Sequence, residues 1–114
     1  NHLAGETGVQ MYRAMLAAGY LAEDGALVHL TEAGQSFAAG FGIDLAALGK
    51  SRAPLCRPCL DWSARQSHLA GKLGRAMLSR MVERGWLARV PDSRLIRFTQ
   101  GGRVAFNSQF PPAA

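Results

Sequence analysis

Cysteine and histidine are the side chains in this chain best suited to chemistry. Cys56 and Cys59 have the Cys-x-x-Cys spacing that forms half of a structural zinc site. A complete site needs four ligands, usually two such pairs, and the sequence has no second pair. Asp61 and His68 follow closely enough to complete a site, but inert thiols in a reducing cytosol are the favoured interpretation. We therefore expect no bound metal and no cofactor.

The three histidines, His2, His29 and His68, form no catalytic pattern. None stands at a motif spacing from a plausible nucleophile, and paired carboxylates and phosphate-binding glycine motifs are absent from the sequence. His2 and His68 recur at the same place in a repeated segment, which favours a structural role. We expect the protein not to be an enzyme.

The net charge of +5 is distributed unevenly. Residues 1–48 carry five acidic side chains and one basic one, whereas residues 49–114 carry twelve basic and three acidic ones. This asymmetry indicates either two surfaces with different partners or simply a solvated charged surface. The chain is 48% hydrophobic and 18% charged, a globular composition, and no stretch approaches the roughly 18 apolar residues of a membrane helix.

Two segments of the chain, 2–5 and 68–71, both read HLAG. When residues 2–21 are aligned with residues 68–87, nine of the twenty positions are identical. Two extra residues then enter the second copy, after which Leu27, Thr31 and Gly34 align with Leu95, Thr99 and Gly102. The pattern indicates a duplicated unit of about 40 residues.

Each copy predicts a helix, a hairpin and a second helix. In the first copy, we expect a helix over 5–18, strands over 20–23 and 27–30, and a helix over 32–40. In the second, we expect a helix over 65–84, strands over 86–90 and 95–98, and a helix over 100–109.

Single residues are expected to mark the ends of these elements. Gly19 and Gly85 should end the long helices, and Thr31 and Thr99 should cap the closing helices. Ser63 or Asp61 should cap the long helix of the second copy. Two aromatic and four sulfur side chains should pack inside the fold: Tyr20, Trp86, Met11, Met15, Met77 and Met81.

Helix, short hairpin and helix make up the second half of a winged helix. The predicted fold class is therefore α+β, with two tandem winged-helix-like units, 1–48 and 49–114. Because the chain opens inside a motif, we expect the first unit to be truncated at its start. We also expect the chain to be a fragment whose parent has a further N-terminal DNA-binding domain.

The segment CRPCLDWSARQSHLAG, followed by GWL and RFTQGGR, resembles the C-terminal half of certain bacterial regulators of the ArsR type. The first HLAG segment and the GIDL stretch at 42–45 also fit that group. The resemblance implies a cytoplasmic, homodimeric transcription regulator that binds operator DNA, and an unknown small-molecule effector is a further expected partner. This chain departs from the group at Ala64, where an acidic residue is usual, and at Gln100, where proline is common.

Two functions remain open from the sequence. In the first, the second copy contacts DNA directly, because a basic helix and a basic wing form the electrostatic footprint of a winged helix. In the second, the chain serves dimerisation or effector sensing, with Phe37, Phe41 and Ile43 at a subunit interface. The candidate DNA-binding residues are Arg65, Lys72, Arg75, Ser79, Arg89, Arg94 and Arg97, with Arg80 and Arg84 flanking them.

Overall fold

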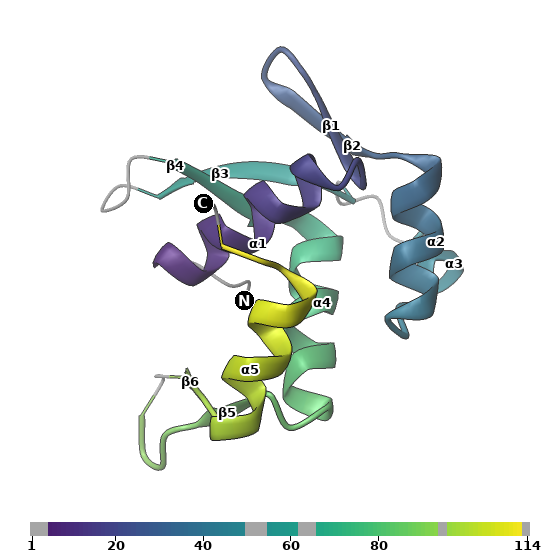
Figure 1. The fold of residues 1–114 in the computed structure, drawn as a ribbon. Coiled ribbons are helices and arrows are strands. Elements are labelled where there is room, and N and C mark those ends of the chain that lie inside the picture. Colours follow the sequence, from purple (N-terminus) through teal and green to yellow (C-terminus); the bar gives the residue numbers. More distant parts are fainter. Residues whose placement is uncertain (1–4, 50–54, 62–65, 94–95, 113–114) are drawn as a thin grey trace.

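Helices and two-stranded hairpins alternate along the chain in a computed structural model, which describes residues 5–49, 55–61, 66–93 and 96–112 (Figure 1). All three hairpins are antiparallel. This agrees with the predicted α+β class, and none of the described helices is long and apolar enough to cross a membrane. In chain order the elements are α1 (Gly5–Ala17), β1 (Leu21–Asp24), β2 (Leu27–Leu30), α2 (Glu32–Gly40), α3 (Leu45–Leu48), β3 (Arg57–Asp61), β4 (Gln66–Ala70), α4 (Gly71–Glu83), β5 (Leu87–Arg89), β6 (Ile96–Phe98) and α5 (Gln100–Gln109).

The four elements predicted for the first unit form with ends within one residue of the expected ones, and α3 follows them as an element that was not predicted. Gly19 has φ +80° and ends α1, since only glycine adopts this conformation without strain. Thr31 is the N-cap of α2: its hydroxyl accepts a hydrogen bond from the Gly34 amide at 3.0 Å and donates one to the Gly19 carbonyl. One threonine therefore joins the end of α1 to the start of α2.

The second unit repeats these contacts. Gly85 has φ +77°, and the Thr99 hydroxyl accepts from the Gly102 amide at 3.0 Å and donates to the Gly85 carbonyl at 2.7 Å. The closing helix α5 covers the predicted range 100–109. The two units thus share the order helix, hairpin, helix and the capping bonds, which is compatible with winged-helix-like units, although the first adds α3 and the second adds the β3–β4 hairpin. A common origin by duplication stays a prediction.

The prediction of one helix over 65–84 was wrong at its start, because residues 66–70 form a strand. β4 pairs with β3, with Arg57 opposite Ala70 and Asp61 opposite Gln66. Helix α4 begins only at Gly71, whose φ of +82° interrupts a continuous helix. The error has a physical reason: Leu69 continues the four-residue spacing of apolar side chains in α4, yet it is buried from a strand.

The predicted caps of α4 are also corrected by the structure. Asp61 is the last residue of β3, Ser63 lies outside the described residues, and no side chain caps α4. The Leu55 carbonyl accepts from the Leu73 amide at 2.8 Å instead, which satisfies one of the donors left free at a helix start.

One continuous core joins the two units. Figure 1 shows α4 between α2 and α5, and α1 packs against β4. The Cα radius of gyration is 13.5 Å, close to the roughly 13 to 14 Å expected for a single compact domain of this length. Fully buried side chains come from both units, and they include all four methionines, as predicted: Met11, Met15, Leu69, Leu73, Met77, Met81, Phe106 and Phe110.

The aromatic side chains join the units to each other. Phe37 stacks on Tyr20 with ring centroids 4.3 Å apart, and its edge meets Phe110 of the second unit at 6.0 Å. Phe41 and Ile43 are buried in the same core. Phe41 and Ile43 are therefore buried inside the chain, whereas Phe37 is only partly buried, and a subunit interface that includes Phe37 stays a prediction. Phe37 and Phe41 pack against aromatic side chains of the second unit in the same chain. Composition alone cannot distinguish such packing within a chain from packing between two chains.

Candidate functional site: the junction between the two units

The basic side chains of α4 were the leading candidates for contact with DNA. The structure excludes Lys72 from this set. Lys72 lies in the first turn of α4 and is only 8% exposed. Its ammonium group donates a hydrogen bond to the carbonyl of Leu48, at the end of α3. A buried ammonium with such a partner stabilises the contact between α3 and α4 and cannot reach a phosphate.

Arg80 and Arg84 form a clamp with Phe41. Arg80 Nε and Arg84 Nη2 each donate a hydrogen bond of 2.9 Å to the Phe41 carbonyl. Phe41 is the C-cap of α2, where free carbonyl groups and the helix dipole concentrate negative charge. The Arg84 guanidinium also lies 4.3 Å from the centroid of the Phe41 ring, within cation–π range. We call these three residues the Phe41 clamp.

A matching contact exists at the other closing helix. Gln10 on α1 donates from Nε2 to the Phe110 carbonyl at 2.7 Å and to Asn107 Oδ1 at 2.8 Å. Phe110 is the C-cap of α5, so the long helix of each unit supplies donors to the end of the other unit's closing helix. The repeat alignment gave no signal of this, because Gln10 aligns with Ala76 and Arg80 aligns with Ala14.

The remaining candidates for DNA contact are exposed but dispersed. Arg75 and Ser79 are exposed on α4, and Arg89 and Arg97 are exposed on β5 and β6. In that hairpin Arg97 stands opposite Ala88, and Arg89 stands opposite Ile96. Because successive residues of a strand alternate between faces, Arg89 and Arg97 lie on opposite faces of the hairpin. The last two candidates, Arg65 and Arg94, lie outside the described residues.

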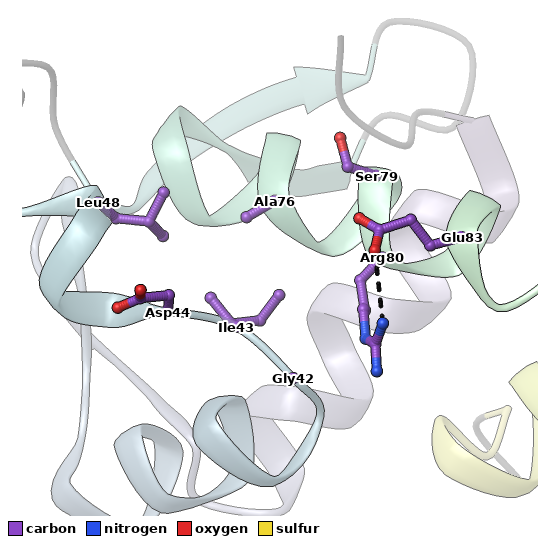
Figure 2. A pocket seen from close by; sticks show the side chains of 8 residues that line it. All are labelled: Gly42, Ile43, Asp44, Leu48, Ala76, Ser79, Arg80 and Glu83. Atoms are coloured by element: carbon purple, nitrogen blue, oxygen red, sulfur yellow. Dashed lines mark hydrogen bonds and ion pairs between the residues drawn. The ribbon is translucent and has the colours of Figure 1, made fainter.

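A cavity of about 150 Å³ lies beside the Phe41 clamp, where α4 meets the segment that joins α2 to α3 (Figure 2). One end has an apolar floor of Ile43, Leu48 and Ala76, and Figure 2 shows the Asp44 carboxylate beside Leu48 at that end. The other end is polar, with Ser79, Arg80 and Glu83. Gly42 completes the lining.

The charged groups of this groove have defined partners. Arg80 Nη1 and Glu83 Oε2 form an ion pair at 3.4 Å, and the Glu83 side chain is 65% exposed. Asp44 is the N-cap of α3, where Oδ1 accepts a hydrogen bond from the Ala47 amide at 3.0 Å. The groove therefore has a fixed apolar floor and carboxylates that retain free oxygen lone pairs.

The thiol of Cys56 is poorly suited to binding a metal. Burial raises the pKa of the Cys56 thiol to about 11, so the thiolate that a metal requires is disfavoured at neutral pH. Burial, and then a 2.9 Å hydrogen bond to Glu23, raise the pKa of nearby Tyr12 as well. Within the described residues, no group of three or more His, Cys, Asp or Glu side chains could hold a metal ion.

Comparison with known proteins gives one informative similarity. No protein-family model matches the chain, and neither does any solved structure. The chain is 42% identical over 106 residues, or 93% of its length, to a Bacillus subtilis (strain 168) protein named "Uncharacterized HTH-type transcriptional regulator YdfF". The match covers 47% of that relative, so the chain spans about half the length of the curated protein it resembles.

Proposed function

We propose that this chain is the C-terminal part of a bacterial, cytoplasmic transcription regulator of the ArsR type. In this proposal it serves dimerisation or effector sensing, while a separate N-terminal winged-helix domain reads operator DNA. Support comes from the similarity to a protein named an HTH-type transcriptional regulator, about twice as long as the matched segment. The CLDW and HLAG segments, which resemble the ArsR-type group, point the same way.

The observation that carries this proposal is that the cations at α4 are bonded to neighbouring helices of the same chain. A recognition helix presents several polar side chains to base edges and phosphates. Here Lys72 is bonded to α3, and Arg80 and Arg84 are bonded to α2. The exposed side of α4 retains Arg75 but also carries Glu83, which phosphates would repel. This helix is therefore better suited to joining two units than to reading DNA.

The test compares residues 1–114 with the full-length gene product. Each is titrated against labelled promoter DNA by fluorescence anisotropy at about 50 and about 200 mM salt. We expect the full-length protein to bind with a steep salt dependence and residues 1–114 to show no sequence-specific binding. Operator binding by residues 1–114 as tight as that of the full-length protein would refute the proposal.

Dimerisation is tested on the chain itself. Five exposed acidic residues of the first unit and the basic second unit give the homodimer a way to assemble by charge. Light scattering after size exclusion should then give a dimer that dissociates as salt is raised. A monomer at low salt and tens of micromolar protein would leave effector sensing as the role. The acidic residues are Glu6, Glu23, Asp24, Glu32 and Asp44.

The second candidate function, direct DNA contact by the second unit, is favoured by the exposure of Arg75, Arg89 and Arg97. If it holds, Arg75→Ala with Arg97→Ala in the full-length protein lowers the salt slope by about one unit for each lost phosphate contact. Arg13→Ala, at an exposed position of α1, is the matched control from the first unit. Unchanged affinity and slope in the double variant would exclude this candidate.

A further inference from the structure

The groove beside the Phe41 clamp is placed to connect the two units. Its walls come from the segment 42–48 of the first unit and from α4 of the second. Arg80 belongs to both features, since it lines the groove and its Nε donates to the Phe41 carbonyl. A molecule in this groove would therefore contact the residue that holds α2 against α4.

The size and floor of the groove fit a small apolar body. Ile43 is 8% exposed, and Leu48 and Ala76 are half-buried beside it, so the floor is packed and already formed. An apolar cavity of about 150 Å³ is large enough to hold one benzene ring. The groove has a volume of that order.

The charged groups that line the groove favour a ligand of positive charge. Asp44 and Glu83 contribute two carboxylates, against one guanidinium from Arg80. That guanidinium is already committed, because Nε donates to Phe41 and Nη1 faces Glu83. The Ser79 hydroxyl lies at the same end of the groove as Glu83 (Figure 2) and is a further acceptor. Acceptors and negative charge are therefore in excess.

We propose that this groove binds a small organic monocation, an ammonium group on an apolar body of about one six-membered ring. The ring lies on Ile43, Leu48 and Ala76, and the ammonium group donates to the Glu83 carboxylate and the Ser79 hydroxyl. This inference deepens the effector-sensing part of the proposed function. Only the regulatory consequence of binding rests on the proposed function, whereas the binding itself is argued from the lining of the groove.

Occupancy would act on the Phe41 clamp. An ammonium group at Glu83 competes with Arg80 for the same carboxylate, so the bound state changes what holds the Arg80 side chain. A ligand shifts a conformational equilibrium only when it contacts the two states differently. Here the difference is the contact between Arg80 and Glu83, next to the bonds that fix α2 on α4.

The test is a titration of residues 1–114 followed by two-dimensional amide NMR. The probes are benzylammonium, its neutral isostere benzyl alcohol, and the anion benzoate. We expect benzylammonium to shift the amides of residues 42–48 and 76–83 and to bind about fivefold or more tightly than benzyl alcohol, since a charge-assisted bond is added. Benzoate should leave these amides unchanged. Equal binding of the three probes, or shifts located elsewhere, would overturn the inference.

Two variants complete the test. Glu83→Gln keeps the shape of the groove and should remove the preference for benzylammonium over benzyl alcohol. Glu32→Gln, at an exposed carboxylate on α2 outside the groove, is the matched control and should keep it. A preference that survives Glu83→Gln would also overturn the inference. None of these measurements uses DNA, so failure here is distinguishable from failure of the proposed function, which the operator titration decides.

Discussion

Replacing Gly102 with alanine tests the contact that holds the closing helix α5 on its unit. A Cβ atom at Gly102 would lie 2.0 Å from the carbonyl oxygen of Trp86 and 2.4 Å from its Cα. Both atoms are backbone atoms at the turn into β5, so neither can move aside as a flexible side chain would. The helix would have to shift away from the hairpin, breaking the bond from the Thr99 amide to the Trp86 carbonyl, which is 2.9 Å long.

The adjacent glycine provides the control. An added Cβ at Gly101 meets nothing within 4 Å, and both residues lie in α5. Both substitutions gain the same helix propensity, about 0.8 to 1 kcal/mol in favour of alanine. The difference between the two variants therefore isolates the steric conflict, for which overpacking in a close contact sets a cost of about 1–3 kcal/mol.

The assay is urea denaturation of the two variants and the parent chain, followed by circular dichroism. We expect Gly101→Ala to be as stable as the parent or more stable. Gly102→Ala should fall below Gly101→Ala by about 1–3 kcal/mol in the free energy of unfolding. Equal midpoints for the two variants would mean that α5 does not pack on Trp86 as described, and the proposed equivalence of the two units would lose its basis.

Four further predictions concern the cap of α5, the Phe41 clamp and the half-buried thiol of Cys56. Thr99→Ala should lower the free energy of unfolding by about 1 kcal/mol in urea melts, whereas Thr99→Ser should retain most of it, because a serine hydroxyl can still cap Gly102. Arg84→Ala should cost about 1–3 kcal/mol in the same assay through its bond to Phe41 and its ring contact, and exposed Arg75→Ala should cost under about 0.5 kcal/mol; equal losses would contradict the clamp. In a Cys59→Ser background, Cys56 should react with iodoacetamide at pH 8 about a hundred times more slowly than free cysteine, because its pKa is near 11. Since that pKa is raised on folding, the associated stability is present below the unfolded pKa and is lost as pH rises towards 11, which urea midpoints at alkaline pH would detect.

Local signals in the sequence predicted most of the elements. Threonine caps, glycine stops and turn residues act over three or four positions, and the structure uses Thr31, Thr99, Gly19 and Gly85 in those roles. The β3–β4 hairpin was missed because the spacing of Leu69 and Leu73 suits a helix as well as a strand that leads into one. One-turn α3, capped by Asp44, is too short to leave a periodic signal.

The candidate site was harder to predict than the elements. The sequence places Lys72, Arg80 and Arg84 on a basic helix, and this much is right for α4. It does not reveal that their partners are the carbonyl groups of Leu48 and Phe41. Every residue has a backbone carbonyl group, so no residue type in the sequence marks these acceptors. Charged side chains bonded to distant backbone therefore look like a free surface until the fold is known.

The crossed contacts at the ends of α2 and α5 make the two units depend on each other. Cut at the connection around residue 50, each piece would still contain the residues of its hairpin and local caps. It would lose the donors to the carbonyl group at the end of its closing helix and the partners that cover its aromatic side chains. Exposing the helix end and the apolar core would lower the stability of both pieces. Separately expressed, the two pieces should be largely unstructured, and mixed at equal concentration they should recover a common fold. The chain can therefore be divided at this connection to make a split reporter. With one piece fused to each of two other proteins, recovery of the folded structure would report that those two proteins are close together.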